Sequence, residues 1–271
     1  KEKGIDIKVV TTLHGTDITL VGSHPNYKTA VEFSINNSDV VTTVSESLKK
    51  DTLRLFNITK EINVIYNFID FEKYPEITDA ECQRKGIALE NERIITHISN
   101  LRPVKRAHDV IDIFYKIQKE IPSKLLLVGE GPDRENIECQ AKDLGILDKV
   151  LFFGNSNEVN KLLCYSDLFL LPSETESFGL SALEAMAART PVISTNSGGL
   201  PEVNIQGETG FLSNVGDTDD MAKNGIYVLK SNEILQKFKQ NALAQAHRFS
   251  LQNVLPSYKE IYSEVVDEDC C

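Results

Sequence analysis

Short apolar runs alternate with longer amphipathic segments along most of this chain. The run at 168–171, for example, reads Leu-Phe-Leu-Leu. A short and wholly apolar run is typical of a strand buried on both faces, as in a parallel sheet. Repeated strand–helix units imply right-handed crossovers, so we predict an α/β fold. From residue 93 onward the pattern predicts strands at 94–98, 124–128, 150–153, 168–171, 192–194 and 210–212, and helices at 105–120, 134–144, 159–164, 178–188, 217–230, 233–248 and 254–265.

The first 70 residues hold a shorter set of the same elements. Strands are predicted at 7–13, 40–44 and 62–66, and helices at 27–36 and 45–56, with Ser45 as the N-cap of the second helix. A doubly wound domain usually has about five or six strands. We therefore expect residues 1–70 to be the latter part of a truncated N-terminal Rossmann-like domain. A linker follows at 71–91, with a short helix at 80–86, and a complete Rossmann-like domain at 92–248. The C-terminal helix and tail at 249–271 are expected to return to the N-terminal domain.

The residue totals exclude several classes of partner. The formal net charge is -11 at pH 7, so we expect no nucleic-acid partner and no broad contact with an anionic membrane. Because no apolar stretch approaches the ~20 residues of a membrane helix, no integral membrane segment is expected. Five scattered cysteines fit no metal framework, and their odd number fits reduced thiols in a cytoplasm.

The stretch at 170–187 carries the strongest candidate chemistry. It leads from an apolar strand through a polar turn, with Glu176 and Gly179, into a helix that contains Glu184. A helix start offers unpaired N–H groups to an anion, and a glycine lets the backbone approach a ligand. With a helix starting at 177 or 178, the two glutamates differ by roughly 80° in direction. They can then accept hydrogen bonds from hydroxyl groups in one cleft, although ordinary solvated helix carboxylates explain each of them alone.

A second candidate loop brings cations to the same predicted sheet edge. Arg102, Lys105 and Arg106 follow the strand at 94–98 and precede a helix. Cations are unfavourable at a helix N-terminus, which weakens the explanation of a merely solvated helix start. Arginine gives bidentate contacts to phosphate and lysine gives a compact charge. We therefore predict phosphate binding by this loop.

The remaining polar loops give weaker signals. The turns at 129–132 and 197–202 are glycine-rich, which tight turns explain as well as ligand binding does. Gly154 and Asn155 end another strand, where their backbone can meet a base. His14 stands at a strand end in a His-Gly-Thr-Asp loop and is either structural or a ligand contact. The acidic tail at 267–269 is interpreted as a charged tail, so no metal site is expected.

Taken together, these motifs resemble the retaining family-4 glycosyltransferases, which have the GT-B fold. The resemblance covers essentially the whole chain and rests on the combination of Pro-Ser-x-x-Glu-Ser-Phe-Gly-Leu at 172–180, Val-Gly-Glu-Gly-Pro at 128–132 and Gly-Gly-Leu-Pro-Glu at 198–202. The motifs at 11–19, 65–70 and 97–106 are most similar to a branch that takes UDP-N-acetylglucosamine as donor and L-malate as acceptor, in the first step of bacillithiol biosynthesis. The resemblance implies a transferase that retains the anomeric configuration without a metal or other cofactor.

The resemblance also implies roles for individual residues. Many relatives have Gly-Arg where this chain has Ser99-Asn100, so the usual phosphate arginine is absent and we expect Arg102 to replace it. No protein base is implied, because the leaving phosphate oxygen takes the acceptor's proton. The implied catalytic residues are Glu176 at the sugar hydroxyls, His14 at the sugar's C6 hydroxyl and Lys105 at the diphosphate. The implied donor-binding residues are Arg102, Asn100, Glu184 at the ribose, Phe178, Gly179 and Leu180 through their amides, and Gly154 and Asn155. The implied acceptor-binding residues are Thr12 and Thr16.

Three functions remain open on the sequence alone. The first is the transferase with L-malate as acceptor. The second is a transferase of the same family with a polysaccharide or lipid-sugar acceptor. The third is a catalytically incomplete donor-binding fragment, which is favoured by a start at Lys1 without an initiator Met and by the missing first half of the N-terminal domain. A homodimer is a further arrangement that the sequence leaves open.

Overall fold

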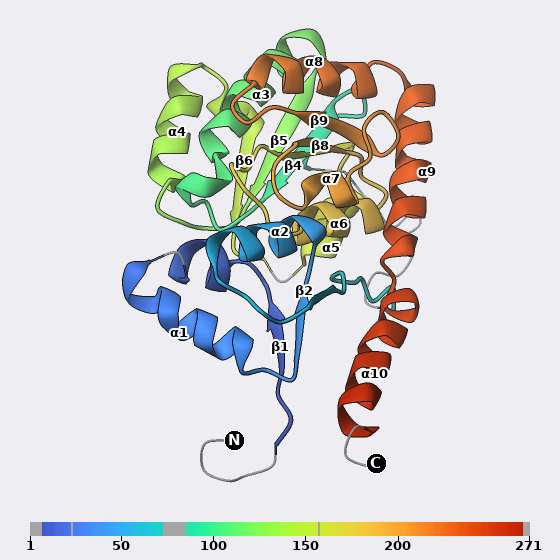
Figure 1. Ribbon diagram of the computed structural model, residues 1–271. Coiled ribbons are helices and arrows are strands. Elements are labelled where there is room, and N and C mark those ends of the chain that lie inside the picture. Colours follow the sequence, from blue (N-terminus) through green and yellow to red (C-terminus); the bar gives the residue numbers. More distant parts are fainter. Residues whose placement is uncertain (1–6, 23, 73–83, 85, 157, 268–271) are drawn as a thin grey trace. The chain divides into compact units, whose positions relative to one another are not determined.

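The computed structural model describes residues 7–22, 24–72, 84, 86–156 and 158–267. The chain divides into two compact units (Figure 1). Unit 1 is Lys1–Phe68 with Phe249–Cys271, and unit 2 is Ile69–Arg248. Most of the predicted linker at 71–91, including the short helix expected at 80–86, lies outside the described residues.

The described part of unit 1 contains a small parallel sheet. Strands β1 (Val10–Leu13), β2 (Val40–Thr43) and β3 (Ile62–Val64) pair in the order β1-β2-β3. Two helices connect them, α1 (Pro25–Asn36) and α2 (Glu46–Leu55). The Ser45 side chain accepts a hydrogen bond from the Leu48 N–H at 3.0 Å, which confirms Ser45 as the predicted N-cap.

The C-terminal helix completes the core of unit 1. Helix α10 (Leu251–Asp267) brings Val254 and Ile261 into a cluster with Ile65, and all three side chains are buried. At its entrance the ring of Phe249 meets Tyr66 edge-on, with 5.4 Å between the ring centroids. Residues from opposite ends of the sequence therefore share one apolar core.

Unit 2 is built on six parallel strands in the order β6-β5-β4-β7-β8-β9 among the described residues. The sequence predicted all six, with ends that agree within one residue. Crossovers run one way from β4 to β6 and the other way from β7 to β9, so the order reverses between β4 and β7. Ligands of open α/β sheets bind outside the carboxyl ends of the strands at such a reversal. The strands are β4 (Arg93–Ile98), β5 (Ser123–Val128), β6 (Val150–Gly154), β7 (Leu168–Leu171), β8 (Val192–Thr195) and β9 (Gly210–Ser213).

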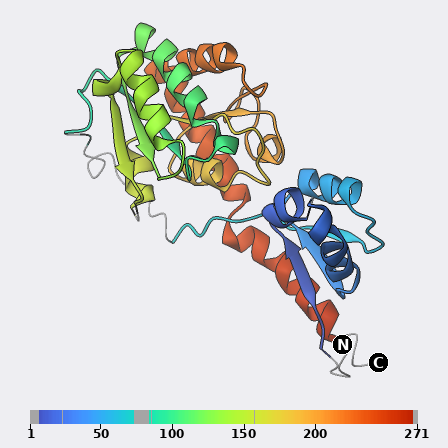
Figure 2. The same ribbon diagram turned by 90° about the vertical axis from the view of Figure 1, so that its left-hand side faces the viewer.

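Helices pack around this sheet (Figure 2). Helices α3 and α8 lie side by side, α4 packs against α3, and α6 packs against α9. Phe114 of α3 and Phe169 of β7 are fully buried in the core, and burial of a side chain of that size contributes about 1.5–3 kcal/mol. The helices are α3 (Ala107–Glu120), α4 (Arg134–Asp143), α5 (Val159–Cys164), α6 (Leu180–Ala187), α7 (Leu200–Val203), α8 (Thr218–Leu229) and α9 (Asn232–Arg248).

Helices α1 and α10 begin two and three residues earlier than predicted. Two helix starts beside the candidate loops come later than predicted, both for a backbone reason. Helix α6 begins at Leu180 rather than near 178, because its N-cap Gly179 has a φ of 96°, in the left-handed region. Glu184 is therefore about one turn inside the helix. Helix α3 begins at Ala107 rather than at 105, because Arg106 has a φ of 49° and separates it from a short 3₁₀ turn at Pro103–Lys105. Both displacements lengthen the loops that carry the candidate chemistry.

The prediction of reduced thiols is wrong for Cys164. Cys164 is disulfide-bonded, whereas Cys139 is a free and exposed thiol. Counting cysteines along the sequence does not show which of them meet in space, and that is why the inference failed.

A buried carboxylate ties the amino edge of the sheet together. Asp167, whose side chain is 3% exposed, precedes β7. One of its oxygens accepts hydrogen bonds from Arg84 Nη2 at 2.7 Å and from the Ile94 N–H at 3.0 Å. The other oxygen accepts from Lys239 Nζ of α9 at 3.2 Å. One side chain thus joins two strands, a helix and the segment that precedes β4.

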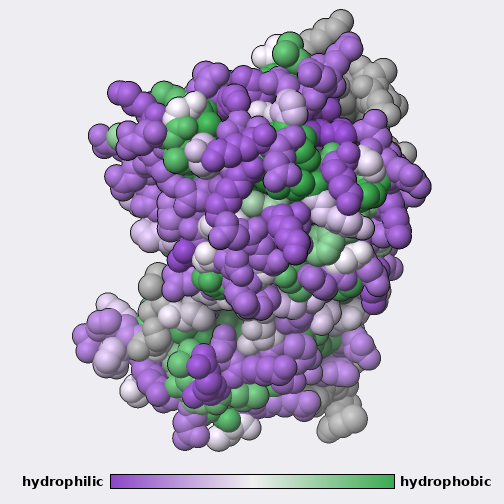
Figure 3. All heavy atoms as spheres, turned by 90° about the horizontal axis from the view of Figure 1, so that it is seen from above, coloured by the Kyte–Doolittle hydropathy of each residue, from purple (hydrophilic) through white to green (hydrophobic). Residues whose placement is uncertain are grey.

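The face seen in Figure 3 is mainly hydrophilic. In Figure 3, charged and polar residues cover most of the visible face, and the hydrophobic patches are small and scattered. Among the described residues, every helix is too short or too polar to cross a membrane.

Candidate functional site

The two candidate loops meet at the point where the strand order reverses. The loop at 99–106 follows β4 and the loop at 172–179 follows β7, and these two strands are hydrogen-bonded neighbours. A backbone hydrogen bond from the Glu174 N–H to the Val104 carbonyl, 2.8 Å long, joins the loops directly. The structure thus places both loops at the expected position for a ligand site.

Lys105 and Glu176 form an ion pair between these loops. Lys105 Nζ lies 2.7 Å from Glu176 Oε1, and the side chains are 23% and 12% exposed. Both residues were predicted from the sequence, where 71 positions separate them. A cation and a carboxylate that are held together and partly shielded from water can serve a phosphate and a sugar hydroxyl at neighbouring points.

The two glycine-rich turns support these loops. A Cβ atom on Gly129 would lie 1.8 Å from the Ser99 carbonyl oxygen, and one on Gly131 would lie 2.0 Å from that of Asn100. In the same way, a Cβ atom on Gly198 would lie 2.0 Å from the Glu176 carbonyl oxygen. The glycines therefore let one backbone pass directly against another, which is a structural role that fixes the two loops.

Substitution of Gly198 is expected to damage the site as well as the fold. Gly198→Ala introduces a clash with Glu176, and the φ of +60° adds strain. The matched control is Gly207→Ala, where φ is +75° and nothing lies within 4 Å of the new Cβ atom. The strain alone costs about 1–2 kcal/mol, and the clash adds about 1–3 kcal/mol. Urea unfolding of the two variants measures the difference, and equal losses would contradict the close approach.

A buried histidine that the sequence analysis gave no role links β4 to β7. His97 is fully buried, with Nδ1 2.8 Å from the Leu170 carbonyl oxygen and Nε2 2.8 Å from Ser99 Oγ. A carbonyl can only accept, so Nδ1 carries the proton and Nε2 accepts from the Ser99 hydroxyl. Ser99 Oγ in turn accepts from the Leu101 N–H at 3.2 Å. These hydrogen bonds hold the start of the loop at 99–106. A histidine inside a largely apolar strand was the sequence signal for it.

This histidine is expected to make stability depend on pH. Burial lowers the pKa of His97 to about 4, with a smaller contribution from the charge of Lys105. Between the ordinary value of 6.5 and about 4 the unfolded chain binds more protons than the folded one, so acidification through this window destabilises the fold, by about 3 kcal/mol in all. Urea unfolding from pH 7 to pH 4 measures the slope. His97→Gln is expected to reduce the dependence of the unfolding free energy on pH, and the exposed control His108→Gln to leave that dependence unchanged. An unchanged dependence in His97→Gln would contradict the assignment of this effect to His97.

The other predicted donor residues lie at the same edge of unit 2. Asn100 and Arg102 are exposed in the loop after β4, next to Leu101, whose φ is 40°. Gly154 ends β6 and Asn155 follows it, and the Gly154 carbonyl accepts from the Gly129 N–H at 2.7 Å. Arg102 therefore lies in the same loop as Lys105, next to the loop that carries Glu176.

The β7–α6 loop holds the remaining predicted donor residues. Phe178 is buried, and Gly179 precedes the helix without a side chain to cap it. Leu180 is the first residue of α6, and Glu184 is half-buried in its second turn. The amides predicted to hold a diphosphate thus belong to the turn that enters the helix and to its first residue.

The predicted residues of unit 1 gather after β1. The exposed His14 begins a turn in which Asp17 Oδ1 accepts from the His14 and Gly15 N–H groups, at 3.2 and 2.7 Å. Thr16 precedes the short helix Asp17–Val21 and is exposed, whereas the Thr12 hydroxyl accepts from Thr42 Oγ1 at 2.8 Å within the sheet. Thr12 therefore has a structural partner already. The structure describes these residues within unit 1 alone.

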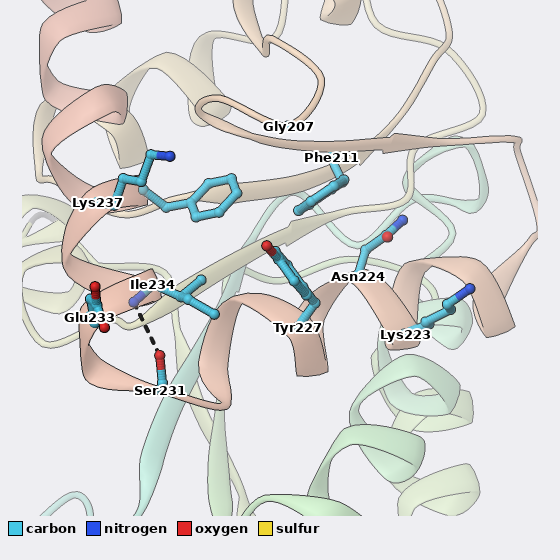
Figure 4. A pocket seen from close by; sticks show the side chains of 10 residues that line it. Gly207, Phe211, Lys223, Asn224, Tyr227, Ser231, Glu233, Ile234 and Lys237 are labelled. Atoms are coloured by element: carbon cyan, nitrogen blue, oxygen red, sulfur yellow. Dashed lines mark hydrogen bonds between the residues drawn. The ribbon is translucent and has the colours of Figure 1, made fainter.

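A separate cavity of about 800 Å³ lies elsewhere on unit 2. Figure 4 shows Phe211 of β9 and Tyr227 of α8 among the side chains that line it. The cavity adjoins the turn between α8 and α9. Asn232, the first residue of α9, accepts a 2.6 Å hydrogen bond from Arg93, the first residue of β4. The cavity is therefore at the amino edge of the sheet, and none of the predicted site residues lines it. Across the described residues, no cluster of three or more His, Cys, Asp or Glu side chains is arranged to hold a metal ion.

Comparison with known families agrees with this geometry. The model for glycosyl transferases group 1 matches residues 79–245, and the model for glycosyltransferase family 4 matches residues 2–73. The chain belongs to the group 1 glycosyltransferases. This glycosyltransferase is 45% identical over 267 residues to the N-acetyl-alpha-D-glucosaminyl L-malate synthase of Bacillus anthracis, which covers 98% of this chain and 70% of that protein.

More distant relatives share the architecture. The glycogen synthase of Mycobacterium tuberculosis is 33% identical over 218 residues, which are 76% of this glycosyltransferase and 50% of that enzyme. Among solved structures, the Anabaena protein HepE in complex with UDP and glucose superposes with a TM-score of 0.87 at 23% identity, over 95% of this chain and 72% of that one. The fold is of the GT-B type, as the sequence predicted. This glycosyltransferase thus spans between half and about 70% of the length of these curated relatives.

Proposed function

We propose that this protein transfers N-acetylglucosamine from UDP-N-acetylglucosamine to L-malate with retention of the anomeric configuration. The observation that carries the proposal is the Lys105–Glu176 pair, 2.7 Å between Nζ and Oε1, at the point where the strand order reverses and beside the start of α6. The choice of donor and acceptor rests on the 45% identity with the Bacillus anthracis synthase.

The donor is proposed to bind with its diphosphate between the two loops. Lys105 and Arg102 supply positive charge, and the amides of Phe178, Gly179 and Leu180 supply hydrogen-bond donors at the helix start. Glu184 accepts from the ribose hydroxyls and Glu176 from the sugar hydroxyls, while Asn100, Gly154 and Asn155 line the nucleotide. From unit 1 we assign His14 to the sugar, and Thr12 and Thr16 to the acceptor.

The proposed reaction needs no metal or other cofactor. The malate hydroxyl oxygen attacks C1 of the sugar while the bond from C1 to the diphosphate oxygen breaks. That phosphate oxygen takes the proton of the malate hydroxyl on the same face, so the products are the glycosylated malate and UDP. Lys105, Arg102 and the helix amides stabilise the charge that develops on the diphosphate, which is preorganised electrostatic catalysis.

Binding and transfer are tested separately. Isothermal titration with UDP tests the donor site of unit 2, and incubation with UDP-N-acetylglucosamine and L-malate, followed by mass spectrometry, tests the reaction. We expect UDP binding and a product heavier than malate by one N-acetylglucosamine residue, without added metal and in the presence of EDTA. Product with a polysaccharide or lipid-sugar acceptor and none with malate would overturn the acceptor, and absence of UDP binding would overturn the donor site.

A further inference from the structure

Ser173 is a buried residue that contacts Glu176 at the candidate site. It lies two residues after β7, is fully buried, and donates from Oγ to Glu176 Oε1 at 2.8 Å. Lys105 Nζ donates to the same oxygen at 2.7 Å. In the described part of the chain, no residue donates to the other oxygen, Oε2. The carboxylate is thus anchored to the protein through one oxygen and offers the second to a ligand.

The two anchors differ in a way that matters once a donor binds. Lys105 is a charged group on a flexible stem, and a diphosphate beside it competes with Glu176 for its N–H groups. The Ser173 hydroxyl is neutral, sits on a short side chain and is shielded from water, so a phosphate does not compete for it. An anchor of this kind can hold the carboxylate while the cation turns toward the leaving group.

Ser173 is itself fixed by its neighbours. The Thr195 hydroxyl, at the end of β8, donates to the Ser173 carbonyl oxygen at 2.7 Å, and Thr195 is fully buried. The Ser197 hydroxyl donates to the carbonyl of Glu174 at 2.7 Å. The end of β8 thus holds the backbone from which Ser173 reaches Glu176.

We propose that Ser173 is a positioning residue that holds the Glu176 carboxylate for recognition of a donor sugar hydroxyl while Lys105 engages the diphosphate. The proposal rests on the proposed function for the identity of the donor. It adds that the contribution of Ser173 appears with the sugar and not with the nucleotide. Its chemistry requires only that the sugar present a hydroxyl group to Glu176.

The test compares two ligands of one site by isothermal titration. In Ser173→Ala, the Kd for UDP is expected to stay within about twofold of the wild-type value, while the Kd for UDP-N-acetylglucosamine rises about tenfold, since a hydrogen bond to a charged group contributes about that factor. Equal weakening of both ligands, or of neither, would overturn the proposal. Because the binding comparison needs no acceptor, it remains decisive even if malate is not the acceptor.

Control variants separate positioning from folding. Ser123→Ala removes another buried hydroxyl, at the amino end of β5, which donates to the Ile121 carbonyl at 2.9 Å; it is expected to change neither ligand. Ser173→Thr restores a hydroxyl and is expected to recover sugar recognition. If the threonine variant does not fold, Thr195→Val provides the second test, with a smaller loss of the same kind; a loss of UDP binding in Thr195→Val would contradict the proposal.

Discussion

Lys105→Ala is expected to lower turnover of UDP-N-acetylglucosamine at least about a hundredfold. The change removes the cation that contacts Glu176 at 2.7 Å and is proposed to stabilise the departing diphosphate. Loss of one preorganised donor to a developing anion costs about 3 kcal/mol in the barrier, which corresponds to about that factor. Glu176→Ala is expected to have an effect of the same size. Release of UDP, followed with a coupled assay, measures kcat.

A second ion pair of the chain provides the control. Lys161 of α5 and Glu158, which precedes that helix, also pair at 2.6 Å, but their side chains are 60% and 66% exposed. Such an exposed pair contributes little, so Lys161→Ala is expected to leave turnover near the wild-type value. Near-wild-type turnover in Lys105→Ala or Glu176→Ala would remove that residue from the mechanism.

Asp167→Ala is expected to lower the free energy of unfolding by about 3 kcal/mol. The carboxylate is 3% exposed and accepts from Arg84, Lys239 and the Ile94 N–H. Removal leaves two cations and one buried N–H without their partner, and the breaking of a buried pair costs about 3–5 kcal/mol. Because both cations are partly exposed to solvent, the lower end of this range is expected. The free energy of unfolding in urea measures the loss.

The matched control removes an aspartate from the surface. Asp51 pairs with Arg54 at 2.7 Å on α2, where the arginine side chain is 72% exposed. Asp51→Ala is expected to cost less than about 1 kcal/mol. Equal losses in Asp51→Ala and Asp167→Ala would show that the buried contacts of Asp167 do not contribute as described.

The sequence predicts the sheet of unit 2 well because its strands are short apolar runs. The run Leu168–Leu171 is buried at every position, as expected for a strand covered on both faces. The order of the strands does not follow from such runs, because it depends on pairings such as Ile95 with Leu168 that join distant parts of the chain. The reversal between β4 and β7, which locates the site, became visible only in the structure.

The same limit applies to the site itself. Glu176 and Lys105 were found from loop chemistry at predicted strand ends, where polar residues stand out against an apolar background. Ser173 and His97 were not assigned roles, because their importance lies in partners that the sequence does not place beside them. The start of α6 was misplaced because a glycine with a φ of 96° leaves no signature that distinguishes it from a glycine in a helix.

The return of α10 to unit 1 has a consequence for the order of events during synthesis. Ile65 leaves the ribosome long before Val254 and Ile261, the two residues that cover it. All of unit 2, which is continuous in sequence, emerges in between. Since domains generally fold as they are made, unit 2 can complete its core while unit 1 still waits for its last helix. Truncation of the chain after Arg248 is therefore expected to leave unit 2 folded and unit 1 without the helix that completes its core.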